Sequence, residues 1–210
     1  MSSPTLEIER SLLEKYDRVI GIDEVGRGAL AGPVAVGAFT LDQKHLDGMP
    51  TDLRDSKLVP EKQRAQLAHD VAEWGHAAVG YSSVEIIENY GINRALQLAA
   101  LDALNSIDLA GAVVLLDGSH NWLGDCGADV VVKVKADRDC GSVSAGAIAA
   151  KVARDELMVR LAGKFPEYGW AGNKGYSSAS HILALQSLGP TEHHRLSWLS
   201  KILSADQALF

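Results

Sequence analysis

Residues 18–34 read RVIGIDEVGRGALAGPV, and this stretch contains the first predicted strand and the first candidate site residues. Its first six residues form a short apolar run typical of a buried strand, and the run ends at Asp23 and Glu24. Gly26, Arg27 and Gly28 follow, and two glycines so close together are typical of a tight turn. The stretch therefore predicts a strand that ends at an acidic pair, with a turn directly after it.

The adjacent acids Asp23 and Glu24 pose a geometric question. In a regular strand, consecutive side chains point to opposite faces of the sheet. The pair can share one site only if the backbone leaves strand geometry there, and the glycines that follow allow this. We therefore expect the backbone to bend at this pair.

Four more stretches have the patterning of strands, and several others have helical signals. The predicted strands are residues 33–41 (PVAVGAFTL), 76–82 (HAAVGYS), 112–116 (AVVLL) and 130–136 (VVVKVKA). The predicted helices are residues 61–74, 83–106 with a break at Gly91, 142–162 with many small residues in its first half, 179–188 and 191–203. This order predicts an α/β domain with a mixed central sheet flanked by helices. A C-terminal helical lobe would lie against one side of it.

Acidic residues end three of the predicted strands: Asp23, Asp117 and Asp137. Sites in open α/β sheets lie at strand ends, so these carboxylates would converge if the three strands are neighbours. Crowded carboxylates repel each other and need cations, and oxygen ligands without His or Cys favour Mg²⁺ or Mn²⁺. Such a ligand set suits two-metal-ion phosphodiester hydrolysis. The alternative for each acid is a turn former, and Asp117-Gly118 is a frequent turn dipeptide.

The net charge of −7 argues against a nucleic-acid partner, because phosphate-binding proteins usually carry a basic footprint. A local basic patch beside an acidic, metal-filled centre would be hidden in that sum, however.

No apolar run is long enough to span a bilayer, and the N-terminus lacks the apolar core of a signal peptide. Cys126 and Cys140 are too few for a disulfide framework, so we expect reduced thiols in a cytoplasmic protein.

Five stretches of the chain resemble, in the same order, the motifs of the ribonuclease HII family. They are residues 21–34 (GIDEVGRGALAGPV), 55–58 (DSKL), 133–155 (KVKADRDCGSVSAGAIAAKVARD), 168–176 (YGWAGNKGY) and 189–195 (GPTEHHR). The resemblance covers nearly all of the chain from residue 18 to about 198. The chain departs from the usual family pattern at Gly146 and Ala147, where Ala and Ser are common.

This resemblance implies a ribonuclease H-like fold with a C-terminal helical extension. We expect an N-terminal segment (residues 1–17), a catalytic domain (18–162) and an extension (163–210) that completes the substrate site. The resemblance also implies a site for two divalent ions, Mn²⁺ or Mg²⁺, formed by Asp23, Glu24, Asp117 and Asp137. Asp155 is the alternative fourth acid, although an i, i+4 ion pair with Lys151 would explain it without catalysis.

The resemblance further implies that Gly26, Arg27 and Gly28 form a turn that recognises a ribose. Glycines let a backbone approach a sugar closely, and peptide groups can hydrogen-bond the 2′-hydroxyl that separates RNA from DNA. Tyr176 matches the tyrosine that packs on the following sugar and reads the RNA-to-DNA junction. The alternatives are a plain tight turn with Arg27 in solvent, and an ordinary packing role for Tyr176.

Basic and hydroxyl side chains are expected to make further substrate contacts, namely Lys57, Lys174, Ser142, Ser144 and Lys151. The first two would contact phosphates, and the other three lie near a helix start, which is a natural anion site. Solvation is the alternative for a surface lysine, and helix capping is the alternative for the two serines.

The expected function is endonucleolytic hydrolysis 5′ of ribonucleotides, both embedded in duplex DNA and in RNA–DNA hybrids, which leaves 3′-hydroxyl and 5′-phosphate ends. It would serve the removal of ribonucleotides from DNA. A non-catalytic hybrid-binding module is one alternative, and the four acids argue against it. A ribonuclease H-fold nuclease that needs a run of ribonucleotides is the other, and the glycine turn and Tyr176 argue against that.

We expect a monomer without a membrane partner. Its C-terminal Leu209 and Phe210 would dock on a sliding clamp, unless the tail packs on the body or is disordered.

Overall fold

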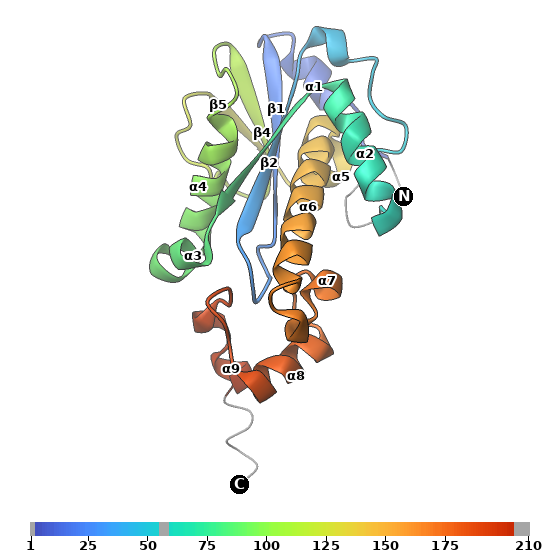
Figure 1. The fold of residues 1–210 in the computed structure, drawn as a ribbon. Coiled ribbons are helices and arrows are strands. Elements are labelled where there is room, and N and C mark those ends of the chain that lie inside the picture. Colours follow the sequence, from blue (N-terminus) through green and yellow to red (C-terminus); the bar gives the residue numbers. More distant parts are fainter. Residues whose placement is uncertain (1–2, 55–58, 204–210) are drawn as a thin grey trace.

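The computed structural model describes residues 3–54 and 59–203, and a mixed sheet forms its centre (Figure 1). Within this part of the chain the strand order is β3-β2-β1-β4-β5. The strands are β1 (Arg18–Val25), β2 (Val34–Leu41), β3 (His76–Ser82), β4 (Ala112–Asp117) and β5 (Asp129–Lys133). The predicted α/β class and mixed sheet are thereby confirmed.

Strand β1 joins the antiparallel and parallel halves of the sheet. It pairs antiparallel with β2, where Ile22 lies opposite Ala38, and parallel with β4, where Ile22 lies opposite Leu116. Strand β4 in turn pairs parallel with β5. Because β1, β4 and β5 are parallel neighbours, their C-terminal ends meet at one end of the sheet, as convergence of the strand-end acids requires.

Helices cover both faces of the sheet (Figure 1). They are α1 (Glu7–Leu12), α2 (Glu61–Trp74), α3 (Val84–Tyr90), α4 (Ile92–Leu104), α5 (Ala136–Asp139), α6 (Gly141–Ala162), α7 (Trp170–Asn173), α8 (Ala179–Leu188) and α9 (Ser200–Leu203), with 3₁₀ helices η1 (Gln43–His45), η2 (Pro166–Tyr168) and η3 (Leu196–Trp198). Helices α1, α2 and α6 pack on one face, and α3 and α4 pack on the other. Among the described residues, no helix is both long and apolar enough to cross a membrane.

Helix α6 lies very close to β1 and β2 because glycines line the contact. A Cβ atom on Gly21 would come within 2.2 Å of the Ser142 carbonyl carbon, and one on Gly37 within 1.9 Å of the Gly146 carbonyl oxygen. Any side chain at these two strand positions would push the helix off the sheet. The small residues predicted to permit a close approach are therefore used for it, Gly146 included.

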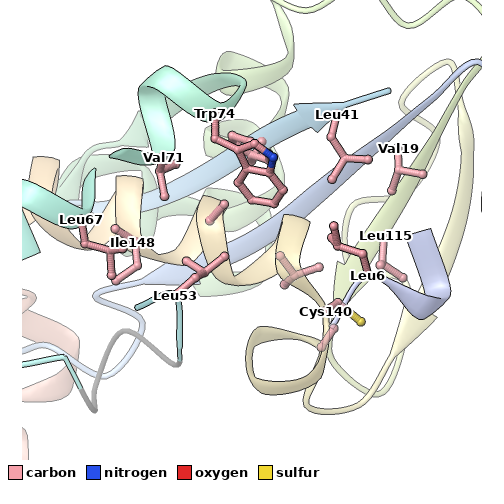
Figure 2. Close-up of a cluster of buried hydrophobic side chains, with 14 of the residues drawn as sticks. Leu6, Val19, Leu41, Leu53, Leu67, Val71, Trp74, Leu115, Cys140 and Ile148 are labelled. Carbon is pink, nitrogen blue, oxygen red and sulfur yellow. The ribbon is translucent and has the colours of Figure 1, made fainter. Parts of the chain in front are cut away.

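The core on the α6 side is closed by α2 (Figure 2). Leu67, Val71 and Trp74 are the buried residues of α2, and Trp74 stacks on Phe39 with ring centroids 4.7 Å apart. Cys140 lies in the same cluster as a free, buried thiol. Burial raises the pKa of Cys140 to about 12, so this thiol is unreactive at neutral pH.

Beyond the sheet, α6 continues into a lobe formed with α7, α8 and α9 (Figure 1). The core of this lobe includes Leu30 and Ala31, which come from the turn between β1 and β2. The Leu30 N–H donates to the Gly175 carbonyl oxygen at 2.8 Å, and the Gly32 N–H donates to the His193 carbonyl oxygen at 2.8 Å. The C-terminal lobe is thus built around the segment that follows the glycine turn.

Two predicted elements are wrong. The strand predicted over 130–136 stops at Lys133, because Lys135 adopts a left-handed conformation with φ 62° and Ala136 begins α5. The single helix predicted over 191–203 is replaced by η3 and α9. Its first residues are bonded elsewhere, since the Thr191 N–H donates to the His194 ring and the Arg195 N–H to the Leu30 carbonyl oxygen.

Candidate active site

A cleft of about 480 Å³ opens at the end of β1, and most of the predicted site residues line it. The predicted residues in its lining are Asp23, Glu24, Gly26, Arg27, Gly28, Lys151 and Tyr176. Val25, Arg64 and Ala147 complete the lining. Segments that lie far apart in the sequence therefore meet at one place, as the proposed constellation requires.

The acidic pair reaches this cleft from a regular strand, so the expected bend at Asp23 and Glu24 is wrong. Strand β1 stays paired with β2 through Val25. The alternation puts Asp23 on the face that carries α6 and Glu24 on the face that carries α4. The pairing with β4 ends at Ile22, so β4 does not separate the two faces beyond that residue. Both side chains can therefore reach the same cleft without a bend.

Asp117 and Asp137 stand beside the cleft rather than in its lining. Asp117 ends β4, and its Oδ1 accepts hydrogen bonds from the backbone N–H of Ala136 at 2.6 Å and of Asp137 at 3.4 Å. Asp117 thus binds the first amides of α5. This contact brings Asp137 back toward the end of β4, although Asp137 lies on a helix and not on a strand.

We call Asp23, Glu24, Asp117 and Asp137 the carboxylate cluster. The pKa of Asp23 lies well above its ordinary value because its carboxyl is buried and because the other three acids repel its charge. The pKa of Asp117 is also raised, mainly by burial and then by Asp137. Hard divalent cations relieve such crowding, and carboxylate oxygens are the ligands that they prefer. Among the described residues, however, no group of three or more acidic, His or Cys side chains already has the arrangement of a metal site.

The turn after β1 presents backbone to the cleft. Gly26 has a φ of 81°, and its N–H donates to the hydroxyl oxygen of Tyr176 at 3.2 Å. A Cβ atom on Gly26 would lie 2.1 Å from Nε of Arg154, whereas one on Gly28 would meet nothing within 4 Å. The fold therefore requires glycine at 26, while glycine at 28 leaves open space through which a ligand can approach the backbone.

Arg27 is only half-exposed and has two partners. Its Nη1 pairs with Oε1 of Glu24 at 3.3 Å, and its Nη2 donates to Oδ1 of Asn93 at 3.4 Å. Asn93 lies in the first turn of α4, so Arg27 connects the acidic pair with that helix. The alternative of a plain turn with Arg27 in solvent holds for its exposure, but the guanidinium also has these two partners on the protein.

Two buried arginines behind the turn were not predicted. Arg195 donates to three carbonyl oxygens, those of Gly26 at 2.8 Å, Arg27 at 2.9 Å and Gly32 at 2.9 Å. Arg154 donates to the carbonyl oxygens of Ala31 at 3.1 Å, Pro33 at 2.9 Å and Lys174 at 3.0 Å. Both arginines lie in motif stretches (VARD and HHR), which was the one signal in the sequence. Burial, with the nearby charge of Arg154, lowers the pKa of Arg195 to about 9, so Arg195 stays cationic at neutral pH.

Asp155 holds two cations at the cleft instead of joining the carboxylate cluster. Its Oδ1 accepts a hydrogen bond from Nζ of Lys151 at 2.8 Å, and its Oδ2 pairs with Nη1 of Arg64 at 3.5 Å. The i, i+4 ion pair expected for Lys151 and Asp155 is therefore confirmed. Arg64 was not predicted, because α2 reaches the cleft only through its packing on α6.

Lys174 lies outside this cleft. It is buried, and its Nζ donates to Oε1 of Glu61 at 2.9 Å and to the carbonyl oxygen of Ala171. It lines a separate cleft of about 340 Å³ together with Glu61, Arg64 and other residues of α2 and α6. A phosphate contact would require Glu61 to release Lys174. Lys57, the other predicted phosphate contact, lies outside the described residues.

Ser142 and Ser144 are fully buried and do not line the cleft. The amide and the hydroxyl of Ser142 both donate to Oε1 of Glu9, each at 2.8 Å. The anion site expected at this helix start is therefore filled by a carboxylate of the protein itself.

The chain is similar in sequence to known proteins. The family model described as Ribonuclease HII matches residues 20–201. A ribonuclease HII of Roseobacter denitrificans is 47% identical over 179 residues, which cover 85% of this chain and 88% of that protein.

Solved structures also align with the chain. The ribonuclease H2 of Pyrococcus horikoshii OT3 aligns with a TM-score of 0.74 at 25% identity, over 90% of this chain and 99% of that one. The RNase HII of Archaeoglobus fulgidus, solved in a complex with PCNA, aligns with a TM-score of 0.71 at 25% identity, over 86% and 94% of the two chains. Bst-RNase HIII, solved in complex with Mn²⁺, has a TM-score of 0.71 over 93% and 72% of the two chains, but at 19% identity it shows the fold alone.

Proposed function

The chain belongs to the ribonuclease HII family and is an endoribonuclease that acts on RNA–DNA hybrids, and we propose that it also cuts duplex DNA 5′ of a single embedded ribonucleotide. The observation that carries this proposal is the 3.2 Å hydrogen bond between the Gly26 N–H and the Tyr176 hydroxyl, in a cleft that Asp23 also lines. The turn offers backbone to a 2′-hydroxyl, and the ring offers a surface to the next sugar. A ribonucleotide followed by a deoxyribonucleotide satisfies both elements at once.

We place two divalent ions on the carboxylate cluster. The oxygen donors suit Mg²⁺ or Mn²⁺, and the raised pKa values of Asp23 and Asp117 reflect crowding that such ions would relieve. When bound, the ions supply water activation and neutralise charge at the phosphate and the leaving oxygen, which yields 3′-hydroxyl and 5′-phosphate ends. Bst-RNase HIII, which shares the fold, was solved in complex with Mn²⁺. Glu24 would have to leave Arg27 in order to serve as a ligand.

Positive charge in the cleft offers the substrate backbone a binding surface despite the net charge of −7. Asp155 holds Lys151 and Arg64 in the lining of the same cleft as Asp23. Cations in such positions attract the phosphates that flank the scissile bond. Part of the negative charge of the chain belongs to the carboxylate cluster itself, so the sum understates the affinity of this surface for nucleic acid.

The test is cleavage of a DNA duplex with one embedded ribonucleotide, with Mg²⁺, Mn²⁺ and a chelator in parallel. We expect one cut 5′ of the ribonucleotide with either ion and none with the chelator. Asp23→Asn should lower kcat by about 1000-fold, while Asp125→Asn, an exposed acid outside the cleft, should not change it. Near-normal cutting by Asp23→Asn would rule out this mechanism. A hybrid with a run of ribonucleotides, assayed beside the single site, tests the alternative preference for runs.

We also propose that Leu209 and Phe210, which lie outside the described residues, dock on a sliding clamp. The RNase HII of Archaeoglobus fulgidus was solved in a complex with PCNA, which supports a clamp partner. The test compares the full chain with a chain that lacks residues 207–210 in co-elution with the clamp. Unchanged co-elution would rule out this contact. We further propose a cytoplasmic monomer, and size-exclusion chromatography tests the monomer.

A further inference from the structure

A buried arginine of the C-terminal lobe, Arg195, donates hydrogen bonds to the backbone of the glycine turn, for which we propose a role in ribose recognition. Arg195 precedes η3, and it is 0% exposed. Its Nη2 donates to the Gly26 carbonyl oxygen at 2.8 Å and its Nη1 to the Arg27 carbonyl oxygen at 2.9 Å. Its Nε and Nη2 also donate to Gly32, at 3.2 Å and 2.9 Å, and its guanidinium lies 4.8 Å from the Trp198 ring centroid.

This guanidinium forms no ion pair with a carboxylate in the described part of the chain. Peptide carbonyls and an aromatic ring compensate its charge instead, although burying a cation without an anion is costly. Packing alone would be served better by an apolar side chain of similar size. The contacts use the planar, forked guanidinium that only arginine has. A lysine has fewer N–H donors, and all of them are on one nitrogen atom, so it could not bind these carbonyl oxygens in the same way.

The hydrogen bonds from Arg195 also set the direction of the backbone N–H groups of Arg27 and Gly28. In a trans peptide unit the C=O and N–H bonds point in opposite directions. The Gly26 carbonyl shares its unit with the Arg27 N–H, and the Arg27 carbonyl shares its unit with the Gly28 N–H. Because both carbonyls point at the buried Arg195, both N–H groups point away from it. Neither N–H has an acceptor among the residues that the structure describes, and both residues line the cleft.

We propose that Arg195 is a positioning residue for sugar discrimination, which holds two carbonyls so that the N–H groups of Arg27 and Gly28 face the cleft as donors for a ribose 2′-hydroxyl. This inference rests on the proposed function. Donors that the protein leaves unpaired are available to a ligand. The open space at Gly28 gives a sugar room to reach them. Arg195 itself does not contact the substrate.

The experiment compares wild type with Arg195→Lys and Arg195→Met. It measures KM and kcat for a duplex with one ribonucleotide, and the inhibition constant Ki of the same duplex made only of DNA. Arg195→Lys keeps the charge but loses the fork, so we expect KM to rise about 10-fold while Ki stays within about twofold. The ratio of Ki to KM, which measures discrimination, should therefore fall in both variants.

Leu185→Ala is the matched control, because Leu185 is fully buried in the core of the same lobe and is not a partner of Gly26 or Arg27. It should loosen the lobe and leave the ratio of Ki to KM unchanged. If KM and Ki rise together in a folded Arg195→Lys protein, Arg195 only holds the lobe in place and the inference is overturned. If wild type itself has no preference for the ribonucleotide, the proposed function fails instead.

A measurement on wild type keeps the test open if the variants do not fold. Amide hydrogen exchange followed by NMR should show fast exchange at Arg27 and Gly28, and slower exchange at Gly26, whose N–H is bonded to Tyr176. With a chelator present to prevent cleavage, the duplex with one ribonucleotide should protect the first two amides, and the all-DNA duplex should not. Protection of both amides in the free protein, or equal protection by the two duplexes, would overturn the inference.

Discussion

The carboxylate of Glu9 accepts hydrogen bonds of 2.8 Å from both the amide and the hydroxyl of Ser142, which lies 133 residues later in the chain. Glu9 belongs to α1, and Ser142 belongs to the first turn of the 22-residue helix α6. Both residues are fully buried. Because α6 carries Ala147 and Lys151 into the lining of the cleft, the N-terminal helix α1 helps to hold an element of the site in place.

Loss of the Glu9 acceptor should destabilise the fold, whereas loss of its charge should not. Burial raises the pKa of Glu9, so ionisation of this carboxyl adds nothing to stability. Glu9→Ala leaves the Ser142 donors unpaired and should lower the free energy of unfolding by about 2–3 kcal/mol. Glu9→Gln keeps an acceptor and should change it by less than about 1 kcal/mol. Urea unfolding at neutral pH measures the free energy of unfolding of both variants. An equal decrease in the two variants would contradict the prediction.

Alanine at position 28 should separate function from stability. Gly28→Ala meets no atom of the protein within 4 Å, so the free energy of unfolding should stay within about 1 kcal/mol of wild type. The methyl group would stand where we place the sugar, so kcat/KM for the single-ribonucleotide duplex should fall about 10-fold or more. Gly26→Ala is the contrast, because its φ of 81° and the contact with Arg154 should cost about 2 kcal/mol or more. Full activity of Gly28→Ala would argue against a sugar at this turn.

The substitution Asp155→Asn should show whether Asp155 holds Lys151 and Arg64 in place or serves as a metal ligand. Asp155→Asn breaks the ion pairs with Lys151 and Arg64, which should cost about 2 kcal/mol of unfolding free energy and raise KM. We expect kcat to stay within about threefold of wild type, because Asp155 is not part of the carboxylate cluster. Steady-state kinetics with Mg²⁺ measure both constants. A fall in kcat comparable to that of Asp23→Asn would show instead that Asp155 takes part in the chemistry.

The C-terminal lobe contains a pair of buried, neutral histidines. Nε2 of His181 lies 3.0 Å from Nε2 of His194 and 3.1 Å from the donor Nε1 of Trp170. The Thr191 N–H donates to Nδ1 of His194 at 2.9 Å, so Nε2 of His194 carries the proton that His181 accepts. Burial, with the neighbouring His181, lowers the pKa of His194 to about 4.

This pair should make the protein less stable in mild acid. The folded-state pKa of His194 lies below the unfolded value of 6.5, so its contribution is present above pH 6.5 and is lost as pH falls from 6.5 toward 4. The full loss should be about 3 kcal/mol. Urea unfolding at pH 7.5, 6 and 5 measures it, with His194→Gln as the control that lacks this titration. An equal pH dependence in both proteins would contradict the prediction.

Much of the fold could be predicted from local patterns. The run of residues 112–116 is apolar throughout because β4 is buried on both faces of a central sheet. The strand predicted over 130–136 failed at its end because its alternation continues past Lys133, where the bond between Asp117 and the Ala136 N–H has already begun a helix. No local pattern reports a hydrogen bond between residues 19 positions apart.

The candidate site was predicted through motif resemblance more than through geometry. The motifs marked Asp23, the glycine turn and Tyr176, which do line one cleft. They also marked Ser142, whose donors are taken by Glu9. Arg64 was not predicted because it lies in none of the motif stretches, and Arg195 was not predicted because the motif that contains it implied no role for it.

The sequence alone determined the strand that carries Asp23 and Glu24, the small residues that let α6 approach the sheet, and the order of the motifs. Each of these features depends on residues that are adjacent in the sequence, so it can be predicted from the sequence alone. The tertiary structure alone decided that the acidic pair reaches one cleft from an unbroken strand, because β4 stops pairing at Ile22. It also decided that Arg195 holds the turn at Gly26, 169 residues away. Hydrogen bonds of this kind depend on distance in space, which packing sets and spacing along the chain does not.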